Sequence, residues 1–316
     1  MNIELFSHSK YKFPGKVGDD TALIIPDLVY AVFDGATDPT GATYQGQSGG
    51  RIAARTAAAT IARLASQGAL ADMPLGDVLQ AISDDVLAAA RRYGATHPPS
   101  TTAAIALDMG EYFRIILAGD TGIRINGSAL YQHHKLIDAV SNSARIAIFK
   151  HLAGQNECRD AVEMETRSIV FNGLDWAVQR QILSGELAEK IIADAGRAVG
   201  HNNEPAIERF LSGGIRIQPG FANNGATILG FASLNGGKVL LDGTRDFKVE
   251  KATLKSLEIF SDGYLTQPKG TMIADWETEF ALVEKADFHK IDAYPSVKGS
   301  TTSEFCDDRT VLSIAF

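Results

Sequence analysis

The residues of this chain with the clearest chemical potential are aspartates at the ends of strongly apolar segments. The segments read VYAVFDG, RIILAGD, SLEIFSDG, RTVLSIAF and TALII, and the aspartates at their ends are Asp34, Asp120, Asp262, Asp307 with Asp308, and Asp19 with Asp20. If the segments are strands, their ends hold these side chains at the rim of a sheet, where several can converge on one pocket. Carboxylates a few ångströms apart repel one another by several kcal/mol at partly buried sites, so such a pocket needs a cation.

Carboxylate clusters of this kind suit hard divalent cations. Mg²⁺ and Mn²⁺ prefer oxygen ligands, whereas zinc and softer ions favour clusters of cysteine and histidine. The chain has only Cys158 and Cys306, which are too few for a disulfide framework, are wrongly spaced for a zinc cluster and fit a reducing, cytoplasmic setting. For any single Asp-Gly pair, a plain turn is the more frequent explanation. Five such sites together favour a shared metal site.

Composition and charge limit the classes of partner. The 316 residues carry a formal net charge of −8, which argues against nucleic acid as the main partner, because such binding needs clustered Lys and Arg. The N-terminal stretch MNIELFSHSKYKF has no apolar core behind a basic segment, and nowhere do enough apolar residues follow one another to span a bilayer. We therefore expect neither a secretion signal nor a membrane span.

Hydrophobic periodicity predicts the elements that must position these aspartates. In the first half, strands are predicted over residues 21–26, 28–33, 101–108, 112–117 and 122–126, and amphipathic helices over 48–68 and 74–92. The last three strands are joined by short turns and should form an antiparallel meander, which the helices should cover.

The second half of the chain is predicted with less regularity. The region from about 135 to 220 has a mixed, mostly helical pattern, in which 175–199 is the clearest helix. Strands are predicted over 226–232, 238–241, 254–260 and 310–316, and a helix over 274–285. No internal repeat or low-complexity linker is present.

The order and flanks of these aspartates resemble the type 2C (PPM) family of metal-dependent protein phosphatases, of which the chain looks like a divergent, bacterial-like member. The matches run in order along the chain, and the stretch from about 135 to 251 matches poorly. The matching motifs are Val32-Phe33-Asp34-Gly35, Ser100-Thr101-Thr102-Ala103, Gly119-Asp120-Thr121, Ser261-Asp262-Gly263 and Asp307-Asp308-Arg309-Thr310-Val311.

The resemblance implies an α+β fold, a four-layer αββα sandwich of two antiparallel sheets flanked by helices. It also implies a single type 2C phosphatase-like domain over residues 1–316, with a divergent, mostly helical insertion or flap region at about 135–220.

The resemblance further implies a role for each aspartate. Two Mg²⁺ or Mn²⁺ ions would lie at one edge of the sandwich, and a water bridging them would attack a phosphoserine, a phosphothreonine or another phosphate monoester directly. Asp34 would bridge both ions, and Asp120 matches a position that helps relatives hold a weaker third ion. The full set of ligands would be Asp20, Asp34, Gly35 through its carbonyl, Asp120, Asp262 and Asp307.

Three departures from the family pattern bear on activity. Ala36 stands where the family often has a histidine that protonates the leaving oxygen, and such help is worth about 10²- to 10⁴-fold in rate. No arginine precedes the first acidic pair to bind the substrate phosphate, so Lys16 or Lys12 could substitute only as a point charge. Asp308 replaces the usual asparagine and adds a negative charge beside the predicted metals.

Two other functions remain open at this point. In a haloacid-dehalogenase type of phosphatase, the nucleophilic aspartate also follows an apolar strand as Asp34 does, but the required second aspartate is replaced by Ala36. Alternatively, the chain is a catalytically weak or inactive relative that acts as a protein-binding module. The sequence names no substrate beyond a phosphorylated protein or another phosphomonoester.

Overall fold

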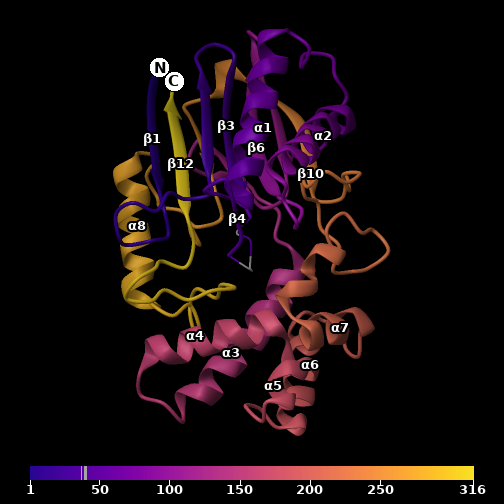
Figure 1. Cartoon of the computed structure of the whole chain (residues 1–316). Coiled ribbons are helices and arrows are strands. Elements are labelled where there is room, and N and C mark those ends of the chain that lie inside the picture. Colours follow the sequence, from indigo (N-terminus) through magenta and orange to yellow (C-terminus); the bar gives the residue numbers. More distant parts are fainter. Residues whose placement is uncertain (37, 39–40) are drawn as a thin grey trace. The chain divides into compact units, whose positions relative to one another are not determined.

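The computed structural model describes residues 1–36, 38 and 41–316 of the chain (Figure 1). Within this described part, no helix is both long and apolar enough to cross a membrane.

The described residues group into two compact units. The first, here called the sandwich unit, consists of residues 1–134, 232–282 and 307–316. The second, here called the helical unit, consists of residues 135–231 and 283–306. That the whole chain acts as one phosphatase-like domain with an inserted helical region stays a prediction.

The sandwich unit contains two five-stranded sheets in which all neighbouring strands are antiparallel. One sheet has the order β10 (Thr244–Glu250), β7 (Tyr112–Ala118), β6 (Thr101–Asp108), β3 (Val29–Gly35) and β2 (Thr21–Ile25). The other has the order β1 (Asn2–His8), β12 (Arg309–Ala315), β11 (Ser256–Phe260), β8 (Gly122–Ile125) and β9 (Ala129–Tyr131). A short ribbon pairs β4 (Thr43–Tyr44) with β5 (Gln47–Ser48).

Strand β3 is buried on both faces, and its alternating side chains enter two different cores. Phe33 and its alternate neighbours pack with helices α1 (Gly49–Ser66) and α2 (Leu75–Tyr93). Tyr30 and Val32 pack between the two sheets, with residues of β8, β11 and β12. Because side chains alternate along a strand, Asp34 continues the series of Tyr30 and Val32 at the rim of the layer between the sheets.

The outer face of the second sheet is covered by α8 (Ile273–Ala286) (Figure 1). Trp276 packs on Phe260 of β11 with ring centroids 4.8 Å apart, and Glu277 accepts two hydrogen bonds from Arg309 of β12. Helices therefore flank two antiparallel sheets, and the predicted α+β sandwich is confirmed.

The predicted meander is wrong in its third strand. β6 and β7 form the expected hairpin, but β8 pairs with β11 in the other sheet. The chain changes sheets at Gly119, whose φ of +82° is open to glycine but strained for other residues. Sequence pattern alone does not distinguish a hairpin from such a crossing.

The strands predicted over 226–232 and 238–241 are also wrong. These segments contain no named strand. Leu229 is buried in the helical unit and Val239 in the sandwich unit, whereas Ile228 and Leu241 are exposed. Conversely, the edge strands β1 and β10 went unpredicted. The burial of β10 alternates irregularly because charged residues such as Asp246 occupy it.

The helical unit is built from α3 (Leu136–Ala153), α4 (Arg159–Asn172), α5 (Leu174–Gln179), α6 (Gly185–Ala198) and α7 (Pro205–Gly213), which share one apolar core. The single helix predicted over 175–199 is wrong, because the chain breaks between α5 and α6. Gln181 has a left-handed backbone with φ of 59°, and Ser184 caps α6 by accepting a hydrogen bond from the Leu187 backbone NH.

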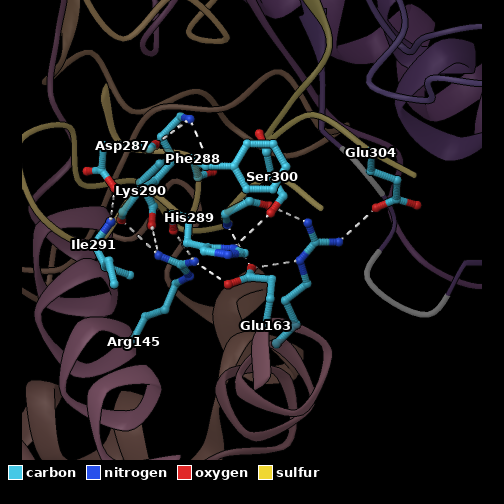
Figure 2. Close-up of polar contacts among 12 residues, drawn as sticks. Arg145, Glu163, Asp287, Phe288, His289, Lys290, Ile291, Ser300 and Glu304 are labelled. Carbon is cyan, nitrogen blue, oxygen red and sulfur yellow. Dashed lines mark hydrogen bonds and ion pairs between the residues drawn. The ribbon is translucent and has the colours of Figure 1, made fainter. Parts of the chain in front are cut away.

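A charged network lies inside the helical unit (Figure 2). Glu163 of α4 and Arg145 of α3 are fully buried and ion-paired, and Arg167 donates from Nε to the second Glu163 oxygen at 2.9 Å. Arg145 also donates to the carbonyl oxygens of His289 and Lys290 at 2.7 and 2.9 Å. The network thus ties residues 287–304 to α3 and α4.

This network should respond strongly to the loss of one partner. We expect Glu163→Gln to lower the free energy of unfolding by about 3 kcal/mol, because it leaves the buried Arg145 guanidinium without its counter-charge. The matched control is Asp85→Asn, which removes the exposed ion pair to Arg63 and should cost less than about 1 kcal/mol. Urea unfolding followed by circular dichroism measures both, and equal effects would contradict this assignment.

Candidate functional site

Asp34 and Gly35 end β3 at a point of very close backbone packing. A Cβ at Gly35 would lie 2.5 Å from the carbonyl oxygen of Gly50 and 2.7 Å from that of Asp19, so only glycine fits. Thr101 Oγ1 donates to the Asp34 carbonyl oxygen at 2.6 Å. The start of α1 and the segment before β2 are therefore pressed against the end of β3, beside Asp34.

Asp19 and Asp20 immediately precede β2 and are both buried. Ser261, which follows β11 in the other sheet, donates from Oγ to Asp20 Oδ2 at 2.7 Å. Ser48, the N-cap of α1, donates to Asp19 Oδ1. The acidic pair thus joins the ends of both sheets, with Asp20 turned toward the second sheet and Asp19 toward α1.

Asp262 and Asp307 approach the same rim from the second sheet. Asp262 follows β11, and its side chain is hydrogen-bonded to that of Asp34. Asp307 precedes β12, and it is close enough to Asp34 for its charge to raise the Asp34 pKa. Gly263 lies so near the Asp308 carbonyl oxygen that a Cβ would sit 1.9 Å from it. Gly35 and Gly263 are thus both required for close backbone packing at the ends of β3 and β11.

Asp120 lies at the point where the chain crosses from one sheet to the other. It is buried, and its carbonyl oxygen accepts a hydrogen bond from Gln132 Nε2 at 2.9 Å. Its carboxylate is near enough to Asp34 to raise the pKa of that group. All the predicted acidic ligands therefore lie in the sandwich unit, at one rim of the two sheets.

The pKa values of Asp34 and Asp20 are both raised at this rim. Burial raises the pKa of Asp34 well above its ordinary value, and the charges of Asp20, Asp120 and Asp307 raise it further. The pKa of Asp20 is likewise raised to about 8. Burial is the largest cause, the charges of Asp308 and Asp307 also raise it, and the hydrogen bond from Ser261 lowers it in part. Each group resists ionisation because it is buried and, in addition, because its neighbours are negative.

These residues fit a hard divalent cation by the chemistry of their donor set. Among the described residues, no three or more aspartate, glutamate, histidine or cysteine side chains are grouped so that they could already hold a metal ion. The rim nevertheless presents carboxylate oxygens whose ionisation is suppressed by burial and by mutual repulsion, and a dication would offset that penalty. No thiol or imidazole is among the predicted ligands, which disfavours zinc.

Asp308 has a structural partner that the sequence did not suggest. Its two carboxylate oxygens accept hydrogen bonds from the backbone NH groups of Lys10 and Asp19, at 2.6 and 2.9 Å. The buried Lys10 ammonium lies 3.9 Å from Asp308 Oδ2. Although burial alone lowers the Lys10 pKa, the surrounding carboxylates raise it overall. The extra negative charge at position 308 is therefore balanced by Lys10.

A cavity of about 510 Å³ opens beside Asp20. Lys12 and Lys16, the predicted phosphate contacts, both line it, and so does Arg51 from the first turn of α1. The sequence pattern did not indicate Arg51, because it follows the acidic pair at a distance along the chain and meets Gly18 only in the fold. Ala36 is exposed and brings no proton donor to this region.

Neither a protein-family model nor a curated protein matches the sequence. Among solved structures, the chain is similar to a serine/threonine phosphatase from Staphylococcus aureus, with 12% identity over 100% of this chain and 94% of that one, at a TM-score of 0.47. It is also similar to a serine/threonine phosphatase catalytic domain, PstP, solved with two manganese ions, with 13% identity over 98% and 96% of the two chains and a TM-score of 0.45.

The raised pKa values predict how stability depends on pH without metal. Asp20 ionises near its ordinary pKa in the unfolded chain but keeps its proton to about pH 8 when folded. The folded state therefore binds more protons between these values, and stability falls as pH rises through this window. In EDTA at pH 8, we expect Asp20→Asn to raise the free energy of unfolding by more than about 1.4 kcal/mol, the equivalent of one pKa unit.

The matched control for this experiment is Glu189→Gln, which neutralises an exposed carboxylate of α6 and should leave the pH dependence unchanged. Thermal and urea unfolding from pH 5 to pH 8 give the measurement. A destabilised Asp20→Asn protein at pH 8 in EDTA would contradict the repulsion described above.

Placing asparagine at position 308 should be harmful. Asp308→Asn leaves one acceptor oxygen for two backbone NH groups and removes the counter-charge of the buried Lys10. We expect a loss of about 3 kcal/mol in the free energy of unfolding. The double variant Lys10→Met with Asp308→Asn should regain part of this loss, as measured by a double-mutant cycle in urea. An Asp308→Asn protein as stable as the parent would show that Lys10 does not depend on this partner.

Proposed function

We propose that the chain is a metal-dependent phosphatase that hydrolyses phosphoserine, phosphothreonine or another phosphate monoester. The observation that carries this proposal is the electrostatic coupling of Asp34 to Asp20, Asp120 and Asp307 at one rim of the sandwich unit. A protein that only needed turns at these strand ends would gain nothing from gathering their charges. The motif order along the sequence supports the same function.

The metal ligands in this proposal are the residues that the sequence singled out. Asp34 is the central ligand, because it is hydrogen-bonded to Asp262 and its pKa is raised by the charges of three further aspartates. Mg²⁺ or Mn²⁺ is the proposed cofactor, with two ions and a weaker third one near Asp120. The proposed set is Asp20, Asp34, Gly35 through its carbonyl, Asp120, Asp262 and Asp307.

When bound, such ions would acidify a water and offset the charge that builds on the phosphoryl oxygens. The chain's own residues supply the positioning. Ser261 and the packed glycines at positions 35 and 263 hold the carboxylates at fixed strand ends. Lys16, on the rim of the neighbouring cavity, is proposed to attract the substrate phosphate as a point charge. No covalent intermediate with the enzyme is needed.

The leaving group has no histidine to protonate it at position 36. Because Ala36 cannot donate a proton, the leaving oxygen must take one from water, and turnover should depend strongly on how basic that oxygen is. An activated ester such as p-nitrophenyl phosphate avoids this dependence, which makes it the more sensitive assay for the metal chemistry.

The test is hydrolysis of p-nitrophenyl phosphate and of a phosphothreonine peptide with Mn²⁺ or Mg²⁺. We expect EDTA to abolish turnover and Asp34→Asn to lower kcat/KM by at least about 100-fold, since even residues behind metal ligands typically cost 10- to 100-fold. The control, Asp27→Asn, changes an aspartate at the other end of β3, in a left-handed turn that asparagine tolerates, and should keep full activity.

Metal-independent turnover, or an unchanged Asp34→Asn protein, would contradict the proposal. If neither ester is hydrolysed while calorimetry detects Mn²⁺ binding, the protein-binding module replaces the phosphatase as the better account of this chain.

A further inference from the structure

The cavity beside Asp20 has the size of a ligand site. Its volume of about 510 Å³ falls within the range of about 300–1,000 Å³ that small-molecule pockets occupy in proteins. It is formed by residues of the segment 7–18, together with Asp20 and Arg51. Because Asp20 belongs to the candidate metal centre, a group in this cavity would lie next to the reacting phosphate.

The lining of the cavity is basic, although the chain as a whole is acidic. Lys12, Lys16 and Arg51 line it, and Asp20 is the one carboxylate among the described lining residues. The formal net charge of the chain is −8, which would by itself repel a phosphorylated substrate. The cavity therefore presents a local positive charge beside the proposed active site, although the net charge of the chain is negative.

The cationic groups are held in place by the fold. Arg51 Nη1 donates to the Gly18 carbonyl oxygen at 2.7 Å, and within the described residues no carboxylate is ion-paired with this guanidinium. Its neighbour Gly50 packs directly on Gly35, so Arg51 stands beside the end of β3. The Lys16 ammonium lies 4.2 Å from the centroid of the Tyr11 ring.

We propose that this basic cavity, formed by Lys12, Lys16 and Arg51, also binds a second anionic group of the substrate, beside the phosphate that Lys16 attracts, and so selects phosphopeptides with acidic residues next to the phosphorylated one. The inference rests on the proposed function and adds a substrate preference to it. Arg51 offers planar NH donors that match a carboxylate, while the two lysines act as point charges. Exposed Phe13 and Val17, each 65% exposed, border the cavity and can contact the peptide chain.

The experiment compares two phosphothreonine peptides that differ only in their flanking residues, Asp and Glu in one and Asn and Gln in the other. With Mn²⁺ at low ionic strength, we expect the acidic peptide to have a kcat/KM at least about fivefold higher, since each exposed pair contributes little on its own. The preference should shrink as salt is added, because salt screens exposed charges. A third peptide with a flanking phosphoserine tests whether a second phosphate serves as well as a carboxylate.

Variants then assign the preference to the cavity. Arg51→Gln and Lys16→Gln should each reduce the ratio of the two kcat/KM values toward one, and Lys16→Arg should retain it. Lys190→Gln, which removes an exposed lysine of α6, is the matched control and should keep the parental ratio. Urea midpoints of all variants confirm that they are folded.

Equal turnover of the two peptides by the parent protein, or a ratio unchanged in both Arg51→Gln and Lys16→Gln, would overturn the inference and leave the proposed function intact. Hydrolysis of neither peptide, and of no p-nitrophenyl phosphate under the same conditions, would instead contradict the proposed function. Fluorescence anisotropy with labelled peptides then tests the cavity by itself, and equal affinity for the acidic and neutral peptides would overturn the inference.

Discussion

Repulsion between aspartates at the rim of two sheets is the constraint on which the rest of this structure depends. Burial and neighbouring carboxylates oppose the ionisation of Asp34 and Asp20, and holding these side chains together therefore lowers the stability of the fold when they are charged. The surrounding chain is arranged accordingly. Glycines allow backbone contact at the strand ends, serine hydroxyls donate to the acidic pair, and Lys10 balances Asp308. An arrangement so unfavourable without a counter-ion is best explained by one.

The sandwich gives these charges a common position because strands from both sheets end at the same rim. β3 sends alternate side chains into the helix-facing core and the inter-sheet core, and Asp34 continues the inter-sheet series. The second sheet contributes the residues after β11 and before β12. The helical unit is stabilised differently: a buried network of charged groups joins its helices to the segment 287–304.

Much of this could be predicted from the sequence, and the rest depended on tertiary contacts. The aspartates were found because each adjoins a long apolar strand, and their order matched a family pattern. The crossing at Gly119 was missed because a tight turn reads the same whether the next strand joins its own sheet or another. Arg51 and Lys10 were missed because their partners, Gly18 and Asp308, are distant along the chain and meet them only in the fold. The charged edge strand β10 lacked the apolar alternation on which strand prediction relies.

The central claim is that Asp34 and its neighbours bind divalent cations, and anomalous X-ray scattering from crystals soaked in Mn²⁺ tests it most directly. We expect two anomalous peaks, about 3.5–4 Å apart as in other two-metal sites, with the Asp34 carboxylate in contact with both. Peaks at crystal contacts or elsewhere on the surface, with none within bonding distance of Asp34, would contradict the account.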